Sequence, residues 1–307
     1  MTDATPETTA PPVGHAPRAP LRLIVNPSAG GGRAGRALPA VSAALDELGL
    51  EHHAAMTRDL EHARELARVA AAGGEISVAF GGDGLIGAVA GAVSEGGGLL
   101  GVLPGGRGND FARTLGIPLK PVPACAVLGC GKEAALDLGT AGSRVFVGIA
   151  SCGFDSDANR IANQTRFIRG NLVYVYGMLR ALVSWKPASF TLELDDGSAR
   201  TFHGYSVAAA NSRFYGGGMM IAPDASLTDG QLELVLVKDL SRRRYLMLAP
   251  SVFRGTHVRQ PNVEVLRAST VRISASRRFT LYADGDPITE LPATVSSQPA
   301  AVRVLVP

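Results

Sequence analysis

The chain has 307 residues, of which 46% are hydrophobic and 19% are charged, a composition typical of globular proteins with about two domains. Lys and Arg number 30 against 27 Asp and Glu, and no lysine-rich block occurs, so nucleic acid is not expected as a partner. No apolar run is long enough to span a bilayer, and the three cysteines lack metal-site spacing, which indicates a reduced, cytoplasmic protein.

The N-terminal segment 1–20 contains acidic residues and repeated prolines but no apolar core segment. This pattern excludes a secretory signal peptide and predicts a disordered tail.

From Leu21 onwards, short apolar strands alternate with alanine-rich helices. We expect strands over 21–27, 51–57, 75–80 and 99–104, and helices over 35–49, 60–74, 86–97 and 111–116. Such alternation predicts right-handed βαβ units and a parallel sheet, as in nucleotide-binding α/β domains.

The pattern changes at about Asp137. Later segments alternate polar and apolar residues between turn signals, which predicts a β-rich, mostly antiparallel domain. We therefore place an α/β domain at 21–137 and a β-rich domain at 138–307, with a cleft between them. The last strands could return to the first domain.

One helical segment, 167–185, interrupts the β-rich half. Its apolar residues recur near helical spacing, which favours an amphipathic helix that covers the sheet. The alternative interpretation is one wall of an apolar pocket for a lipid chain. The residues concerned are Leu172, Val175, Tyr176, Leu179 and Leu182.

Glycine-rich loops follow three of the predicted strands, at 26–32, 81–84 and 104–110. Ligands of parallel sheets bind beyond the carboxyl ends of the strands, where all three loops would meet. The first loop, NPSAGGG, precedes a helix, so its N–H groups, with Arg33 and Arg36, suit an anion. A plain tight turn explains its glycines equally well.

The other two loops each contain an aspartate. Asp83 or Asp110 alone could be a helix cap, and Asn109 a left-handed turn residue. Two such loops at neighbouring strand ends instead favour a glycine-lined cleft with two carboxylates. Nucleotide phosphates with Mg²⁺ suit such a cleft.

Six motifs in this order resemble the diacylglycerol kinase catalytic family, which includes soluble bacterial lipid kinases and the sphingosine and ceramide kinases. They are NPSAGGG, GGDG, GVLPGGRGNDFAR, GFD, YGGGMMIAPDASLTDGQLEL and ADGD, between Leu21 and Asp286. The resemblance implies a lipid kinase with a cleft between an α/β nucleotide domain and a β-rich lipid domain.

The resemblance also implies roles for individual residues. Asp83 would act through Mg²⁺ on the transferring phosphate, Asp110 would complete the polar network, and Asp286 would be the general base on the lipid hydroxyl. The ATP-binding residues would be Asn26, Pro27, Ser28, Ala29, Gly30, Thr57, Gly81, Gly82, Asp83, Gly84, Arg107 and Asn109.

By the same resemblance, the segment DASLTDGQ would hold a structural metal ion through Asp229, with Ser226 and Gln231 contributing mainly backbone carbonyls. The residues themselves indicate only Asx-type turns there. They likewise indicate a hairpin turn at the ADGDP segment that contains Asp286.

The chain departs from the family pattern at the expected site. Leu85, Gly87 and Ala88 replace a threonine, an asparagine and a glutamate, Arg107 replaces another threonine, and Asp286 replaces a glutamate. Each lost hydroxyl removes about 0.5–1.5 kcal/mol of hydrogen bonding, which an arginine bidentate to phosphate can offset. A base shortened by one methylene could slow transfer about 100-fold.

We therefore expect an ATP- and Mg²⁺-dependent lipid kinase of phospholipid metabolism, transiently peripheral to the membrane. Its substrate would be diacylglycerol or a related lipid alcohol at the bilayer surface. Two alternatives stay open: a catalytically impaired nucleotide- or lipid-binding regulatory homologue, and a kinase of a soluble substrate such as NAD. The sequence determines neither the lipid nor whether the chain forms a homodimer.

Overall fold

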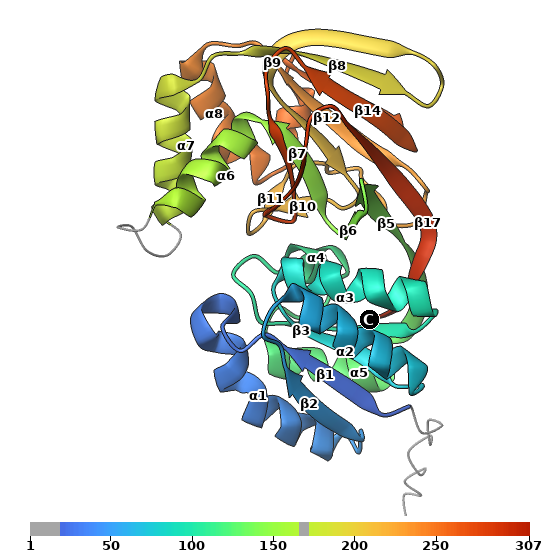
Figure 1. Ribbon diagram of the computed structural model, residues 1–307. Coiled ribbons are helices and arrows are strands. Elements are labelled where there is room, and N and C mark those ends of the chain that lie inside the picture. The colour runs from blue at the N-terminus through green and yellow to red at the C-terminus, as the bar shows by residue number, and fades with distance from the viewer. Residues whose placement is uncertain (1–18, 166–171) are drawn as a thin grey trace, which may run out of the picture.

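The computed structural model describes residues 19–165 and 172–307, in two layered halves stacked end to end (Figure 1). Apart from its last two residues, the predicted tail 1–20 lies outside this range.

The first half follows the predicted alternation of strands and helices. Strands β4, β3, β1 and β2 lie side by side in that order and are all parallel. Helices α2 and α3 pack together, and so do α1 and α5. The elements are β1 (Leu21–Val25), α1 (Ala29–Glu47), β2 (His52–Met56), α2 (Leu60–Ala72), β3 (Ile76–Gly81), α3 (Asp83–Gly96), β4 (Leu99–Pro104), α4 (Asp110–Thr114) and α5 (Pro121–Cys130).

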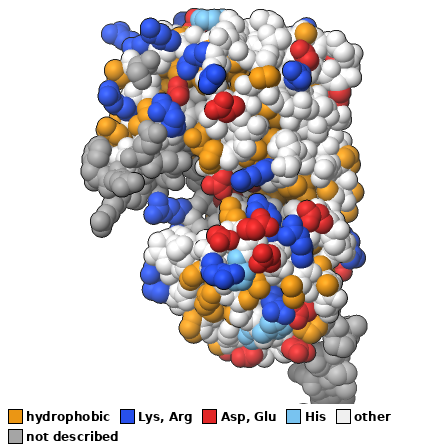
Figure 2. Space-filling view, viewed as in Figure 1, with side chains coloured by type: hydrophobic (Ala, Val, Ile, Leu, Met, Phe, Trp, Pro, Cys, Tyr) orange, Lys and Arg blue, Asp and Glu red, His pale blue; other side chains and the backbone are white. Residues whose placement is uncertain are grey.

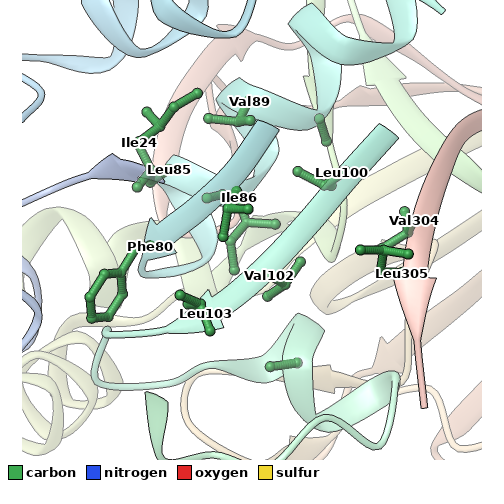
Figure 3. Packing of buried hydrophobic residues seen from close by; sticks show 14 of the residues in the cluster. Ile24, Phe80, Leu85, Ile86, Val89, Leu100, Val102, Leu103, Val304 and Leu305 are labelled. Carbon is green, nitrogen blue, oxygen red and sulfur yellow. The ribbon is translucent and has the colours of Figure 1, made fainter. Parts of the chain in front are cut away.

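Helix α3 lies at the centre of the molecule. Its residues from Leu85 to Val93 are all buried, and most of them are glycine, alanine or valine. Small side chains let this helix pack against α2 and the parallel sheet while it also contacts strand β6 (Arg144–Phe146) of the second half. Figure 3 shows the core that forms between α3 and the sheet.

The second half is β-rich and mostly antiparallel, so the predicted fold class is confirmed. Its remaining elements are β5 (Lys132–Ala141), β7 (Ile149–Gly153), α6 (Phe154–Gln164), α7 (Leu172–Ser184), β8 (Ala188–Leu194), β9 (Ala199–Ala210), β10 (Phe214–Tyr215), β11 (Met219–Met220), β12 (Leu232–Lys238), α8 (Arg242–Val252), η1 (Thr256–Arg259), β13 (Val263–Ala268), β14 (Thr270–Ala275), β15 (Thr280–Ala283), β16 (Asp286–Glu290) and β17 (Ala293–Val306).

Strand β17 joins the two halves. Its first part pairs with β14 in antiparallel fashion, and its end pairs in parallel with β4 of the first half. Strand β5 runs antiparallel along both parts of β17. The end of the chain is therefore part of the parallel sheet, and the predicted domain boundary at 137 falls inside β5.

Sequence patterns do not indicate helices α6 and α8. Within the predicted helical segment 167–185, α7 begins at Leu172, and the part before it lies outside the described residues. Leu182 is 5% exposed and contributes to the core, whereas Leu179 is 47% exposed. The apolar face of α7 is thus only partly covered by the sheet.

The pairing of β17 with β4 predicts that the last residues of the chain stabilise the first half. Leu305 is fully buried, so Leu305→Ala should lower the free energy of unfolding by about 2–5 kcal/mol in urea titrations. The matched control is Arg303→Ala, which removes a surface ion pair with Glu133 and an exposed hydrogen bond to the carbonyl of Gly97, and should cost no more than about 1–2 kcal/mol. Equal effects of the two substitutions would contradict this account.

Candidate active site

Two glycine loops touch at the carboxyl ends of β3 and β4. The N–H of Gly105 donates to the carbonyl of Gly81 at 2.7 Å. A Cβ atom at Gly106 would lie 2.5 Å from the Cα of Gly82, so only glycine allows this approach. The contact sets the position of the residues that follow each loop, Asp83 and Asp110.

The glycine loop after β1 lies at the same edge of the parallel sheet, beside the other two loops. Asn26 accepts two hydrogen bonds through Oδ1, from the N–H and the hydroxyl of Ser28. Three consecutive glycines, 30–32, have positive φ, and a Cβ at Gly30 would lie 2.5 Å from the carbonyl oxygen of Gly105. Arg33 links the loops because its guanidinium donates to the carbonyl of Gly106 at 2.6 Å.

Asp83 and Asp110 connect loops rather than cap their own helices. Asp83 is the first residue of α3, and its Oδ1 accepts a hydrogen bond from the N–H of Phe111 at 3.0 Å. Asp110 is the first residue of α4, and its Oδ2 accepts from the N–H of Gly217 in the second half at 2.8 Å. The expected left-handed turn residue is Asn109, with φ of 54°.

Two further carboxylates reach the same region from the β15–β16 hairpin. Asp284 accepts hydrogen bonds from the N–H groups of Val147, Gly148 and Ile149, at 2.9, 3.0 and 3.2 Å. Asp286 faces the start of α3, since its Oδ2 lies 3.0 Å from the position of a Cβ at Gly84.

Burial raises the pKa of three of these carboxyl groups. For Asp284 burial outweighs the three N–H donors and, with the charge of Asp83, raises the pKa to about 7. Burial also raises the pKa of Asp110, and the charge of Asp83 adds to that shift. Asp286 is largely exposed as a residue, so water limits the upward pKa shift that partial burial of its carboxyl group produces.

The carboxylates fit a cation that has other ligands besides protein. Asp110 is 6% exposed, and within the described residues its Oδ1 has no hydrogen-bond partner, although the guanidinium of Arg113 lies 3.8 Å from it. The described residues contain no group of three His, Cys, Asp or Glu side chains that could hold a metal ion unaided. Mg²⁺ commonly takes one or two carboxylates together with phosphate oxygens and water, which agrees with this arrangement.

A cavity of about 380 Å³ adjoins the third loop. Arg33, Arg36 and Lys120 contribute positive charge to its wall, beside Gly105 and Gly106. The three glycine loops, 26–32, 81–84 and 104–110, therefore have cationic side chains on one side and carboxylates on the other.

Comparisons with known proteins agree with this geometry. Residues 20–141 match the diacylglycerol kinase catalytic domain, and residues 148–306 match the YegS C-terminal NAD kinase beta sandwich-like domain. A diacylglycerol kinase of Mycobacterium tuberculosis is 35% identical over 295 residues, covering 94% of this chain and 95% of its own. The chain belongs to the diacylglycerol kinase family.

Two further proteins share less sequence identity with this chain. A diacylglycerol kinase of Bacillus subtilis (strain 168) is 28% identical, covering 86% of this chain and 89% of its own. A crystal structure from Bacillus anthracis str. Sterne superposes with a TM-score of 0.80 at 19% identity, covering 97% of this chain and 99% of its own, which shows a common fold. At the family level the chain is thus a lipid kinase.

Most of the residues predicted for this kinase site lie together. The loops 26–30, 81–84 and 109–110 form one edge, with Asp286 opposite Gly84. Thr57 follows β2, and its N–H donates to Val25 at the end of β1. Arg107 is exposed on the third loop.

The residues predicted to hold a structural metal form a separate loop. Asp229 accepts a hydrogen bond from the N–H of Gln231 at 3.1 Å, and the hydroxyl of Ser226 lies 3.2 Å from that of Thr228. These are the Asx- and Ser/Thr-type turns that the residues indicate. The metal role of this loop stays a prediction.

Leu85 packs against the GGDG loop from the core side, because its Cδ2 atom lies 2.6 Å from the position of a Cβ at Gly81. It is 3% exposed and packs in the core, with Ile24 nearby (Figure 3). Gly87 and Ala88 also differ from the family pattern. A Cβ at Gly87 would lie 3.3 Å from Asp284 Oδ2, and Ala88 is buried. These three residues pack α3 against its neighbours. Their lack of polar groups therefore removes no hydrogen-bonding group from the surface of the glycine loops.

Sequence reasoning missed Asp284 and Gly217. The ADGD segment forms the predicted hairpin, with Asp284 and Gly285 both at positive φ, so the turn signal was correct. Only the fold reveals that the Asp284 side chain turns back to the N–H groups before β7. Gly217 lies in the YGGGMM motif, but nothing in that motif indicates its bond to Asp110.

Restoring the usual threonine at position 85 should harm this kinase. Leu85→Thr removes buried apolar atoms and buries a hydroxyl, so the free energy of unfolding should fall by about 2–5 kcal/mol in urea titrations. ATP affinity, measured by calorimetry on the folded variant, should not rise. A tighter nucleotide complex would show that residue 85 faces the phosphates.

Asp284 should be required for stability. Asp284→Ala leaves three buried N–H groups without their acceptor and should cost several kcal/mol, at about 1–3 kcal/mol for each group. Asp284→Asn retains one oxygen acceptor and should cost less. Asp286→Asn is the matched control on the same hairpin, and it should unfold at nearly the wild-type urea concentration.

Proposed function

We propose that this lipid kinase transfers the γ-phosphate of ATP, with Mg²⁺, to the hydroxyl of diacylglycerol or a related lipid alcohol. The observation that carries the proposal is the convergence of Asp83, Asp110 and Asp286 on one glycine-lined edge. Phosphoryl transfer needs positioning, charge neutralisation and a proton acceptor, and this edge offers groups for each.

The glycine loops suit the phosphates of ATP. Phosphate oxygens approach backbone N–H groups closely only where side chains are absent, as at Gly82 and Gly106. Arg107 extends from the third loop into solvent, and its guanidinium can hold a phosphate in a bidentate way. Asn26 to Gly30, Thr57, Gly81 to Gly84 and Asn109 are proposed to complete the nucleotide site.

Asp83 and Asp110 are proposed to bind Mg²⁺ together with the phosphates. Bound there, Mg²⁺ would neutralise charge on the transferring group. Each aspartate uses one oxygen for a backbone N–H, which holds its carboxylate in place. From the described residues, the Oδ1 of Asp110 accepts no hydrogen bond and has only the ion pair with Arg113 at 3.8 Å, which agrees with this role.

Asp286 is proposed as the general base on the lipid hydroxyl. It lies on the second half, across from Gly84 of the GGDG loop, so a substrate in the cleft would meet it from the side opposite the nucleotide. Burial raises the pKa of its carboxyl group, which makes the carboxylate a better proton acceptor. The Asp229 loop, if it holds a metal, would serve the structure of the second half.

A transfer assay tests these roles. With labelled ATP and diacylglycerol in mixed micelles, Asp83→Asn should reduce phosphate transfer by roughly 10²–10³-fold through loss of charge stabilisation. Asp286→Asn should reduce it by about 10²–10⁴-fold, as expected for loss of a general base. Asp286→Glu, which restores the usual family residue, should retain or increase activity.

Three outcomes would contradict the proposal. Unchanged transfer in Asp83→Asn would exclude a role for this carboxylate in phosphate transfer. Stabilisation by ATP and Mg²⁺ without turnover on any lipid alcohol would indicate a regulatory homologue. Phosphorylation of NAD in place of lipid would assign a soluble substrate.

A further inference from the structure

Helix α8 has few contacts with the rest of the protein. None of its residues is buried. Tyr245 anchors it by stacking on Tyr205 at a ring-centroid distance of 4.5 Å, and Arg242 donates to the carbonyl of Trp185 at 3.2 Å. Most of the helix therefore presents its side chains to solvent.

Large apolar side chains on and just after α8 are exposed. Leu246 is 41% exposed, Met247 75% and Phe253 57%. One exposed apolar residue is ordinary on a protein surface, but several from one short segment indicate a contact surface. An exposed apolar side chain contributes less to the free energy of folding than a buried one, so the stability of the fold does not explain why these residues are apolar.

The same segment is strongly basic. Between Asp239 and Glu264 the sequence contains five arginines and no acidic residue. Arg243, Arg244 and Arg254 are exposed, and none of them forms an ion pair with another described residue. Figure 2 shows basic side chains gathered over the part of the second half that carries α7 and α8. We call Arg243, Arg244, Leu246, Met247, Phe253 and Arg254 the α8 surface.

Helix α7 extends this surface. The bond from Arg242 to Trp185 holds the start of α8 beside the end of α7. Leu179 and Val183, one turn apart on α7, are 47% and 67% exposed. Apolar side chains from two neighbouring helices are thus open to solvent on this part of the second half.

We infer that the α8 surface binds an anionic lipid bilayer. Arginines with interspersed large apolar side chains, on a helix attached only along part of its surface, suit the interface between headgroups and acyl chains. A nucleic acid would attract the arginines but would offer no apolar phase for Met247 and Phe253. Charge complementarity and exposed apolar area therefore favour the same occupant.

A chain of packed residues connects the α8 surface to Asp284 in the candidate active site. Tyr245 also packs on Phe154, at 4.7 Å between ring centroids, and Phe154 begins α6 directly after β7. The N–H group of Ile149, the first residue of β7, holds Asp284. The inference rests on the proposed function in one respect: bilayer binding would bring the kinase to a substrate that resides in the membrane.

Vesicle co-sedimentation tests the inference with the whole chain. Phosphatidylcholine vesicles that contain phosphatidylglycerol should bind the protein, and pure phosphatidylcholine vesicles should bind it weakly. Arg243→Ala with Arg244→Ala should reduce the partition coefficient by about 5-fold for each arginine, roughly 25-fold together, and salt should diminish the difference. Met247→Asp should weaken binding at low and high salt alike.

The matched control is Arg200→Ala with Arg272→Ala, which removes the same charge from exposed strand positions away from α8. Equal losses in the two double variants would reduce the effect to net charge and overturn the inference. So would binding to a model RNA that responds to Arg243 and Arg244 while vesicle binding does not. Phosphate transfer to lipid dispersed in detergent should stay unchanged in the α8 variants, so its failure in the wild type would concern the proposed function alone.

Discussion

The close contact between Gly82 and Gly106 determines the geometry of the site. Two parallel strands end side by side, and each must send its chain into a helix without a side chain between the loops. Because of this approach, Asp83 and Asp110 begin their helices next to each other, and each accepts a hydrogen bond from the backbone of another loop. Any side chain at position 106 would push the loops apart and separate the two carboxylates.

The second half completes the site through hydrogen bonds that backbone N–H groups donate to aspartate carboxylates. Asp110 accepts from Gly217, and Asp284 accepts from the turn that precedes β7. The small residues of α3 let β6 and the β15–β16 hairpin approach, which brings Asp286 to Gly84. The burial that raises the pKa of Asp110 and Asp284 follows from this close packing.

Some of the residues that differ from the family pattern pack in the core, and others are exposed near the glycine loops. Leu85 lies in the core, and Gly87 leaves the space that Asp284 occupies. The presence of these residues just after the GGDG segment is therefore compatible with intact glycine loops. Arg107 and Asp286 differ from the family pattern at exposed positions near the glycine loops, where substitutions can alter ligand binding and catalysis directly.

The sequence by itself determined the parallel half, the glycine loops and the family, because each depends on local signals: apolar periodicity, turn residues and short motifs. Strand β4 was predicted at its observed limits for this reason. Only the tertiary structure decided the role of Asp284, the bond between Asp110 and Gly217, and the return of β17 to β4. Those contacts join residues more than 100 positions apart, and no local pattern specifies which distant backbone groups will meet.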